Sequence, residues 1–299
     1  MAINLEALKA LEITDMRFAY GERETMLYAL SIGMGRDPLD LRELPFVYEG
    51  AALQAVPTMA VVLASTGIIR KTGVDFTKVL HGEQRLTLHR RLPAAGELLA
   101  NSRVAAVYDK GAGKGAVLLL ETTARSAADN APLFTYVMTI MARGDGGFGG
   151  PQGSGPEPHQ LPERAPDQTD TFETRPEAAL LYRLNGDRNP LHADPRVAGR
   201  AGFARPILHG LATYGIACRA VLRTVCDCDA GRVGSFDARF SAPVYPGDRI
   251  VTDMWTDGDV VSFRCRVPDR DVIVLTNGRC FLADHDFRSH GSAALAPLT

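Results

Sequence analysis

The chain has 299 residues, 45% of them hydrophobic and 23% charged, which is enough apolar material for the core of one large domain or two ordinary ones. Its formal net charge of −2, with no block of lysine and arginine, argues against nucleic acid as a partner. The sequence contains neither a secretory leader nor an apolar run of eighteen residues, so we expect a cytoplasmic protein with no membrane partner.

The first half of the chain carries four segments rich in alternating apolar and β-branched residues. They predict strands at Arg85–Arg91, Glu97–Tyr108, Gly115–Ala124 and Phe134–Ala142. A turn of sequence Lys110-Gly-Ala-Gly separates the second of these segments from the third.

A stretch rich in glycine and proline, from Gly144 to about Asp170, predicts a flexible linker because it has little apolar periodicity. We therefore expect an N-terminal half at 1–143, a linker at 144–170 and a C-terminal half at 171–299. Inside the linker, the run from Gly144 to Gly149 matches the G-x-G-x-x-G phosphate-loop pattern. A phosphate loop needs a helix N-terminus behind it, and no helical pattern follows, so we interpret this match as chance.

The second half contains a nearly unbroken apolar segment, Ile207–Val225, which predicts a helix buried on most of its sides. Hairpin signals at Asp257-Gly258 and Pro268-Asp269 separate further alternating segments. These predict strands at Ser235–Val244, Arg249–Thr256, Val260–Val267 and Val272–Leu282. The pattern alone supports an α+β fold with antiparallel sheets.

The two halves are similar to each other at a nearly constant offset. Pro38 and Pro190 occupy similar segments 152 positions apart, and Gly96 and Gly247 mark similar turns 151 positions apart. This offset indicates an internal duplication.

Asp187, Asn189 and His192 lie within six residues in the second half, and together they could hold one water molecule. Pro190 restricts the residue before it, so a turn rather than a helix is expected here. The same string is typical of an ordinary surface turn. Leu191 and the apolar segment further along favour a turn packed against the start of a helix.

The duplicated first half lacks these side chains. In the alignment of the two halves, Gly35 stands opposite Asp187 and Asp40 stands opposite His192. We therefore expect one active site per chain.

Chemistry that activates a water molecule needs a base for the water, a proton donor and a hydrogen-bond donor for a developing oxyanion. Asp187 and His192 can supply the first two. Gly210 begins the predicted buried helix, so its unpaired N–H lies at the positive end of the helix dipole and can supply the third.

The D-x-N-P-L-H string, followed eighteen residues after the histidine by Gly210, resembles the signature of the R-specific enoyl-CoA hydratases, the hydratase 2 branch of the MaoC-like dehydratases. Further similar landmarks are the runs from Leu27, His81, Asp109 and Ala238. The resemblance covers nearly the whole chain and implies a double hot-dog fold. That fold is α+β, with two antiparallel sheets that each wrap a central helix.

The resemblance also implies the reaction and its residues. The reaction is the reversible hydration of a (2E)-enoyl-CoA to a (3R)-3-hydroxyacyl-CoA by a hydro-lyase, expected as a homodimer without a cofactor. Asp187 and His192 would be catalytic, Asn189 would orient them, and the Gly210 amide would polarise the thioester carbonyl. Contacts to the acyl-CoA are implied for His81, Gly82, Lys110, Arg188, Pro190, Leu191 and Phe240.

Several alternatives stay open beside this interpretation. A hot-dog thioesterase would use a carboxylate and a helix-start amide to cleave the thioester, and a non-catalytic acyl-CoA-binding protein could keep the same fold. His209, next to Gly210, is interpreted as a structural histidine bonded to the backbone. Acyl chain length and pathway are not encoded in any motif.

Five cysteines are an odd number in a chain without a leader, which favours reduced thiols. Cys226 and Cys228 are too close in sequence for the usual spacing of zinc ligands, so we expect no metal.

Overall fold

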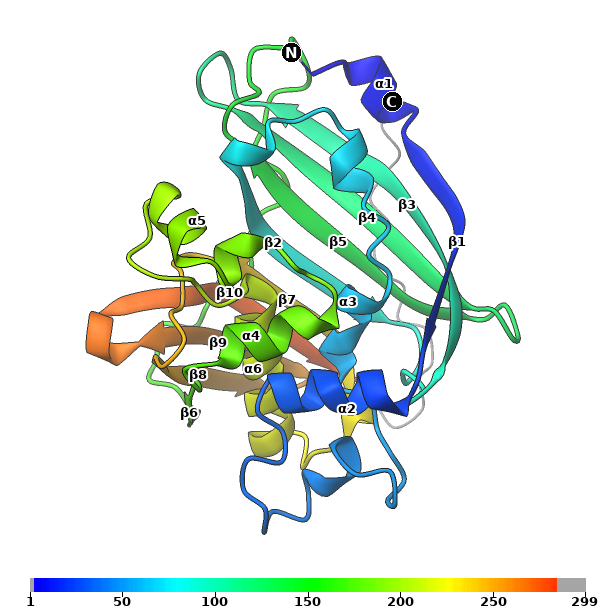
Figure 1. Cartoon of the computed structure of the whole chain (residues 1–299), viewed down its shortest axis with the longest axis vertical. Coiled ribbons are helices and arrows are strands. Elements are labelled where there is room, and N and C mark those ends of the chain that lie inside the picture. Colours follow the sequence, from blue (N-terminus) through cyan, green and yellow to red (C-terminus); the bar gives the residue numbers. More distant parts are fainter. Residues whose placement is uncertain (1–2, 284–299) are drawn as a thin grey trace.

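The computed structural model describes residues 3–283. Within that range, ten strands form one antiparallel sheet in the order β1-β3-β4-β5-β2-β7-β10-β9-β8-β6 (Figure 1). The strands are β1 (Glu12–Tyr20), β2 (Val79–Leu88), β3 (Gly96–Asp109), β4 (Ala116–Ser126), β5 (Pro132–Ala142), β6 (Gln168–Glu173), β7 (Val233–Phe240), β8 (Arg249–Asp257), β9 (Val260–Val267) and β10 (Val272–Leu282).

The helices lie mainly against one face of this sheet. The α-helices are α1 (Leu5–Lys9), α2 (Glu22–Ser31), α3 (Ala60–Leu63), α4 (Ala178–Tyr182), α5 (Pro195–Arg200) and α6 (Gly210–Thr224). Short 3-10 helices occur at Leu44–Phe46, Pro57–Met59, Ile68–Lys71, Phe76–Lys78, Arg183–Asn185, Pro190–His192, Ala230–Arg232 and Pro268–Arg270.

The strand order repeats on either side of the β2–β7 junction, as a duplicated chain requires. At this junction Glu83 pairs with Arg239 and Arg85 pairs with Asp237, so opposite charges face each other across the two halves. The two antiparallel sheets of the double hot-dog fold are therefore continuous with each other. Pairing β2 with β7 removes an exposed edge from each half and joins the two sheets into one.

The long helix α6 is the centre of the second half, as the apolar segment predicts. Every residue from Ala212 to Leu222 is buried. The first half has no helix of this length among its described residues, so the counterpart of α6 there is much shorter than the resemblance implies. The corresponding segment forms only the 3-10 turn Pro57–Met59 and α3, and Gly67 in the left-handed conformation separates it from the next short turn.

The eight predicted strands are confirmed with small shifts of their ends, and the two edge strands β1 and β6 were not predicted. The strand predicted from Arg85 begins earlier, at Val79, because a register shift between His81 and Glu83 accommodates an irregular polar stretch. His81 therefore lies within strand β2.

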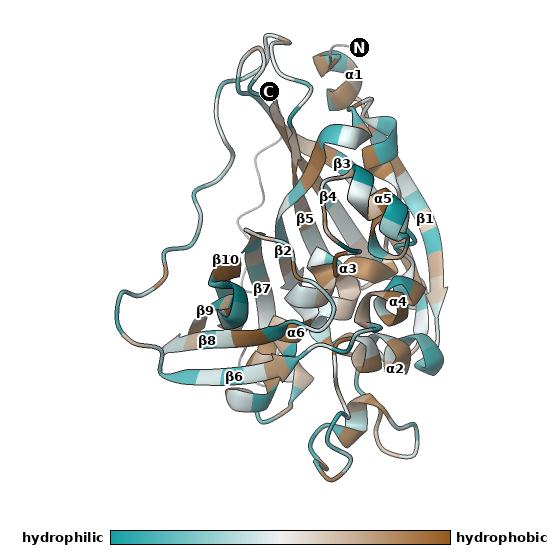
Figure 2. Cartoon of the chain, turned by 60° about the vertical axis from the view of Figure 1, so that its left-hand side comes forward, coloured by the Kyte–Doolittle hydropathy of each residue, from teal (hydrophilic) through white to brown (hydrophobic). Residues whose placement is uncertain are grey.

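The Gly/Pro-rich stretch runs along the outside of the sheet to β6 (Figure 2). It is anchored rather than free, since the Asp109 carboxylate accepts hydrogen bonds from the amides of Gly147 and Gly149, and Trp255 donates to the carbonyl of Arg164. The first two bonds show that the amides of the G-x-G-x-x-G match are occupied by the protein's own carboxylate. Strand β6 begins at Gln168, so the last three residues of the predicted linker belong to the sheet.

Candidate active site

The turn that carries the acid and the histidine is built by local hydrogen bonds. Asn189 is in an extended conformation, with ψ of 122°, and its side chain accepts from the amide of Leu191 at 3.0 Å. The Asp187 carboxylate accepts from the amide of Asn189 at 3.1 Å. The predicted turn is thus confirmed. Asn189 contacts Asp187 through its main chain, while its side chain caps the short helix Pro190–His192.

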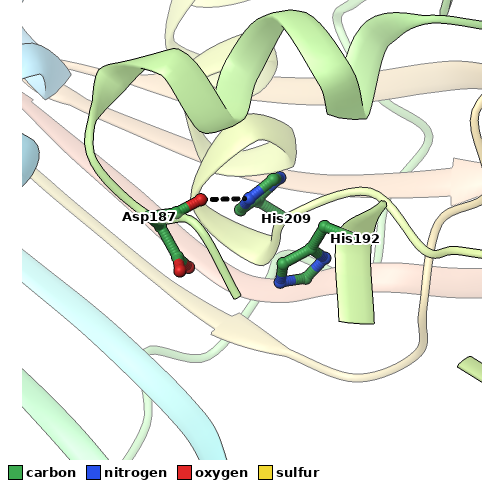
Figure 3. A group of neighbouring side chains, drawn as sticks. All are labelled: Asp187, His192 and His209. Carbon is green, nitrogen blue, oxygen red and sulfur yellow. Dashed lines mark hydrogen bonds between the residues drawn. The ribbon is translucent and has the colours of Figure 1, made fainter. Parts of the chain in front are cut away.

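Asp187 and His192 come together beside the start of α6. The possible ligand atoms of Asp187, His192 and His209 all lie within 4.8 Å of one another. Figure 3 shows the Asp187 carboxylate and the His192 ring side by side. Asp187 is exposed, whereas His192 is only 8% exposed. The pair therefore joins a solvent-accessible carboxylate to a buried imidazole.

The protonation of His192 follows from its contacts. Its Nδ1 lies 2.9 Å from the carbonyl of Ile207, so Nδ1 carries the proton and Nε2 keeps a free lone pair. Burial lowers the pKa of His192, and the hydrogen bond to Ile207 and the charge of Asp187 oppose this effect only in part. A neutral imidazole with a free Nε2 can accept a proton from water.

Gly210 is the first residue of α6 and is exposed. An amide in the first helical turn has no partner within its own helix, so it can donate to a bound oxygen. A Cβ at this position would lie 3.1 Å from the ring of Phe240. Gly210 therefore leaves open the space between the helix start and Phe240.

The structure brings His81 into the same region. Its ring centroid lies 4.7 Å from that of Phe240, and its Nε2 lies 3.2 Å from the carbonyl of Glu83. Burial lowers the pKa of His81 to about 4, and the nearby charge of Asp187 acts in the opposite direction. Gly82, at the register shift, has the side chain of Met141 3.0 Å from where its Cβ would stand.

The other predicted contact residues are less close to this group. Arg188 and Pro190 are exposed and Leu191 is half-buried, and all three lie on the turn that carries Asp187 and His192. Lys110 is exposed in the β3–β4 turn, which lies apart from α5 and α6 at the top of Figure 1. The structure therefore gathers His81 and Phe240 around Gly210 and leaves Lys110 elsewhere.

Several supporting residues were not singled out by the sequence. The amide of Asn185, two residues before Asp187, donates to the hydroxyl of Ser31 in the first half at 2.9 Å. The fully buried ring of Tyr182 lies 5.0 Å from the ring of His209.

The expected backbone bond of His209 is confirmed, with its Nε2 3.1 Å from the carbonyl of Asp187.

Asp187, His192 and His209 are also residue types that bind metals, so their fit to an ion matters. One nitrogen of each histidine is occupied by a carbonyl, and the two rings are stacked with an interplanar angle of 25°. Lone pairs in nearly parallel planes converge poorly on a tetrahedral ion. The arrangement as it stands does not fit a zinc site.

Comparison with known families identifies the two halves separately. Residues 18–144 match the MFE-2 hydratase 2 N-terminal domain, and residues 158–277 match the MaoC like domain. The chain belongs to the hydratase 2 family of MaoC-like dehydratases. The match thus covers both halves of the duplicated sheet.

Individual relatives of this hydratase 2 family member agree with that assignment. The enoyl-CoA hydratase ChsH3 of Mycobacterium tuberculosis is 39% identical over 93% of this chain and 98% of its own. The peroxisomal enoyl-CoA hydratase 2 of Arabidopsis thaliana is 36% identical over 91% and 93%. The crystal structure of a MaoC-like dehydratase from Phytophthora capsici superposes with a TM-score of 0.83 at 32% identity, covering 94% and 98% of the two chains.

The fold is the double hot-dog. A Mycobacterium tuberculosis protein described as having this fold superposes with a TM-score of 0.54 at 17% identity, over 91% of this chain and 94% of its own. Among the residues that the structure describes, no helix has the length and apolar character needed to cross a bilayer.

Proposed function

We propose that the protein adds water reversibly to a (2E)-enoyl-CoA and releases a (3R)-3-hydroxyacyl-CoA, with Asp187 and His192 holding the water. As a member of its family the chain is an enzyme, a hydro-lyase of the enoyl-CoA hydratase 2 or 3-hydroxyacyl-thioester dehydratase type. The observation that supports the detailed proposal is the placement of the Asp187 carboxylate and the neutral His192 beside the first amide of α6.

The reaction can be written with these groups alone. Water gives a proton to the Asp187–His192 pair as its oxygen bonds to Cβ of the enoyl thioester. The electron pair of the Cα–Cβ double bond moves toward the thioester oxygen, which accepts a hydrogen bond from the Gly210 amide. The pair then delivers a proton to Cα, so that the elements of one water are added and the enzyme regains its starting state.

The surroundings of this site supply the rest of the proposal. His81 and Phe240 form a wall beside Gly210, which is suitable for contact with the acyl thioester. Asn189 orients Asp187 through its amide, and Arg188, Pro190 and Leu191 border the site on the same turn. Gly82 shapes β2 next to His81. Lys110 lies apart from these residues in the β3–β4 turn, where it would offer a cation only to the remote phosphates of a bound CoA.

The proposal also includes the domain organisation, the oligomeric state and the location of the protein. The halves at 1–143 and 171–299, joined by the linker at 144–170, are supported by the repeated strand order, although residues 1–2 and 284–299 lie outside the described range. We propose a homodimer in the cytoplasm that works without metal or redox cofactor. Light scattering of the purified protein tests the dimer.

The deciding experiment is turnover of defined substrates. Purified protein is incubated with crotonyl-CoA and longer trans-2-enoyl-CoAs, and the stereochemistry of the hydroxyacyl product is resolved. We expect the (3R) product and no free CoA. A (3S) product would contradict the proposed geometry, release of free CoA would indicate a thioesterase, and binding without turnover would indicate a binding protein.

A further inference from the structure

His209 contacts both members of the proposed catalytic pair. It is the residue just before α6 and is only 3% exposed. Its ring is stacked on that of His192, with the centroids 3.7 Å apart, and its Nε2 lies 3.1 Å from the carbonyl of Asp187 (Figure 3). The side chain of His209 thus contacts both His192 and Asp187 at the start of the helix that carries Gly210.

The hydrogen bond defines the chemical state of this ring. A carbonyl oxygen can only accept a hydrogen bond, so Nε2 of His209 carries the hydrogen and donates to the carbonyl of Asp187. Nδ1 is buried and has no hydrogen-bond partner among the described residues. Burial and the neighbouring His192 lower the pKa of His209 to about 4, with Asp187 opposing them. His209 therefore stays neutral at neutral pH.

We propose that His209 is a positioning residue for the hydration reaction, which holds the main chain of Asp187 and covers one face of the His192 ring. This inference rests on the proposed function. The bond to the Asp187 carbonyl keeps the carboxylate at the distance from His192 that one shared water requires. The stacked ring excludes water from the buried face of His192 and leaves its Nε2 as the reactive edge.

The charged groups around His192 determine how the loss of the His209 ring changes the pKa of His192. Asp187 on the same turn favours the protonated form of His192. Arg183, in the preceding short helix, acts on His209, and His81 from β2 also faces Asp187. Because burial is the main cause of the lowered pKa of His192, removing the ring that covers it raises this pKa.

Two variants separate the two roles. His209→Phe keeps a ring against His192 and loses the donor to Asp187, whereas His209→Gln keeps a side-chain N–H and loses the ring. We expect His209→Phe to lower kcat on the order of 10²-fold with an unchanged acidic limb of the pH profile, because a misplaced catalytic group costs about that much. We expect His209→Gln to retain more of kcat and to move the acidic limb to higher pH.

The measurements are kcat and kcat/KM for crotonyl-CoA from pH 4.5 to 9, thermal unfolding, and an NMR titration of the His192 ring nitrogens in wild type and both variants. Unchanged rates and profiles in both variants would overturn the proposal. Equal losses with an unchanged profile and titration would do so as well, since they indicate a structural role only.

The NMR titration separates this inference from the proposed function. It needs no substrate, so it reports on the coupling of His209 to His192 even if the wild-type protein does not hydrate an enoyl-CoA. In that case the proposed function fails by the turnover assay. The contact between the rings is then judged by whether His209→Gln raises the pKa of His192 and His209→Phe does not.

Discussion

At the scale of single residues, the proposed function depends on Asp187 and His192, which lie five positions apart in the chain and are brought together by a turn. Pro190 prevents a regular helix through this segment, and the Asn189 side chain closes the turn. Asp187 remains exposed and His192 becomes buried. Their different environments suit one group to binding water and the other to moving a proton.

The first prediction concerns this pair. Asp187→Asn and His192→Gln are each expected to lower kcat by several orders of magnitude, because each removes a proton acceptor from the same water. The double variant should be hardly slower than either single one, since the residues act as a unit. Steady-state kinetics with crotonyl-CoA measure this, and circular dichroism checks the fold. Near-native turnover in either single variant would reject the assignment.

The second prediction concerns Gly210. Gly210→Val is expected to lose most hydratase activity while folding cooperatively, because the added carbon atoms point toward Phe240 and occupy the space beside the proposed oxyanion position. Hydration of crotonyl-CoA and thermal unfolding are measured for the same preparation.

A matched control for Gly210 is available in α5. Among the described residues, no heavy atom outside the neighbouring residues and the backbone of α5 itself lies within 4 Å of a Cβ placed on Gly199, so Gly199→Ala should leave activity unchanged and add up to about 1 kcal/mol of stability. A fully active Gly210→Val enzyme would show that Gly210 has only a packing role.

At the scale of elements, α6 joins the two halves through buried charges. Arg219 lies within the otherwise apolar face of this helix, 4% exposed, and its guanidinium is 2.8 Å from the carboxylate of Glu43, which is fully buried. Arg223, one turn further on, lies 3.1 Å from the same carboxylate. Because Glu43 follows α2 in the first half, this contact sets the position of α6 relative to both halves.

The third prediction follows from that burial. Glu43→Leu is expected to lower the free energy of unfolding by about 3 kcal/mol, because Arg219 then stays buried with only the more distant carboxylate of Asp170, 3.9 Å away, to balance its charge. Adding Arg219→Met should restore much of the loss. Chemical denaturation of the two single variants and the double variant gives the coupling between the residues.

The exposed pair Arg249–Asp269 is the control for the buried one. Its side chains are 44% and 60% exposed and lie 2.7 Å apart. Asp269→Ala should cost less than about 1 kcal/mol. If Glu43→Leu and Asp269→Ala lowered the free energy of unfolding by similar amounts, burial would not explain the importance of the contact between Glu43 and Arg219.

At the scale of the whole molecule, the two halves of the duplicated chain carry different side chains at corresponding positions. The position opposite His192 is Asp40, which forms an ion pair with Arg42 at 2.9 Å and lies 3.7 Å from Arg223. Arg42 holds the pKa of Asp40 below its usual value. The first half therefore carries an ion-paired carboxylate where the second half carries His192, the imidazole of the proposed catalytic pair.

The fourth prediction is one site per chain. Calorimetric titration with a non-hydratable acyl-CoA analogue should give a stoichiometry of one, and Asp40→Ala should keep nearly all of kcat because Asp40 faces arginines and not a histidine. Asp187→Asn should bind the analogue with the same stoichiometry. A stoichiometry of two, or a large loss of kcat in Asp40→Ala, would contradict this division of roles.

Much of this molecule was determined by its sequence alone. The eight internal strands follow from local alternation, α6 from its apolar run, and the catalytic turn from Pro190 and its neighbours. Each depends on residues close together in the chain, so each can be predicted without knowledge of its partners. The family signature, which is also local, predicted the proximity of Asp187 and His192 that the structure shows, and the catalytic roles of these residues and of Gly210 stay predictions.

The tertiary structure decided what depends on residues far apart in the chain. The joining of two sheets into one depends on β2 meeting β7, and strands β1 and β6 exist because β3 and β8 have edges to pair with. The loss of a central helix in the first half and the stacking of His209 on His192 also depend on distant neighbours. Pairing and burial are set by such partners, and no local pattern records them.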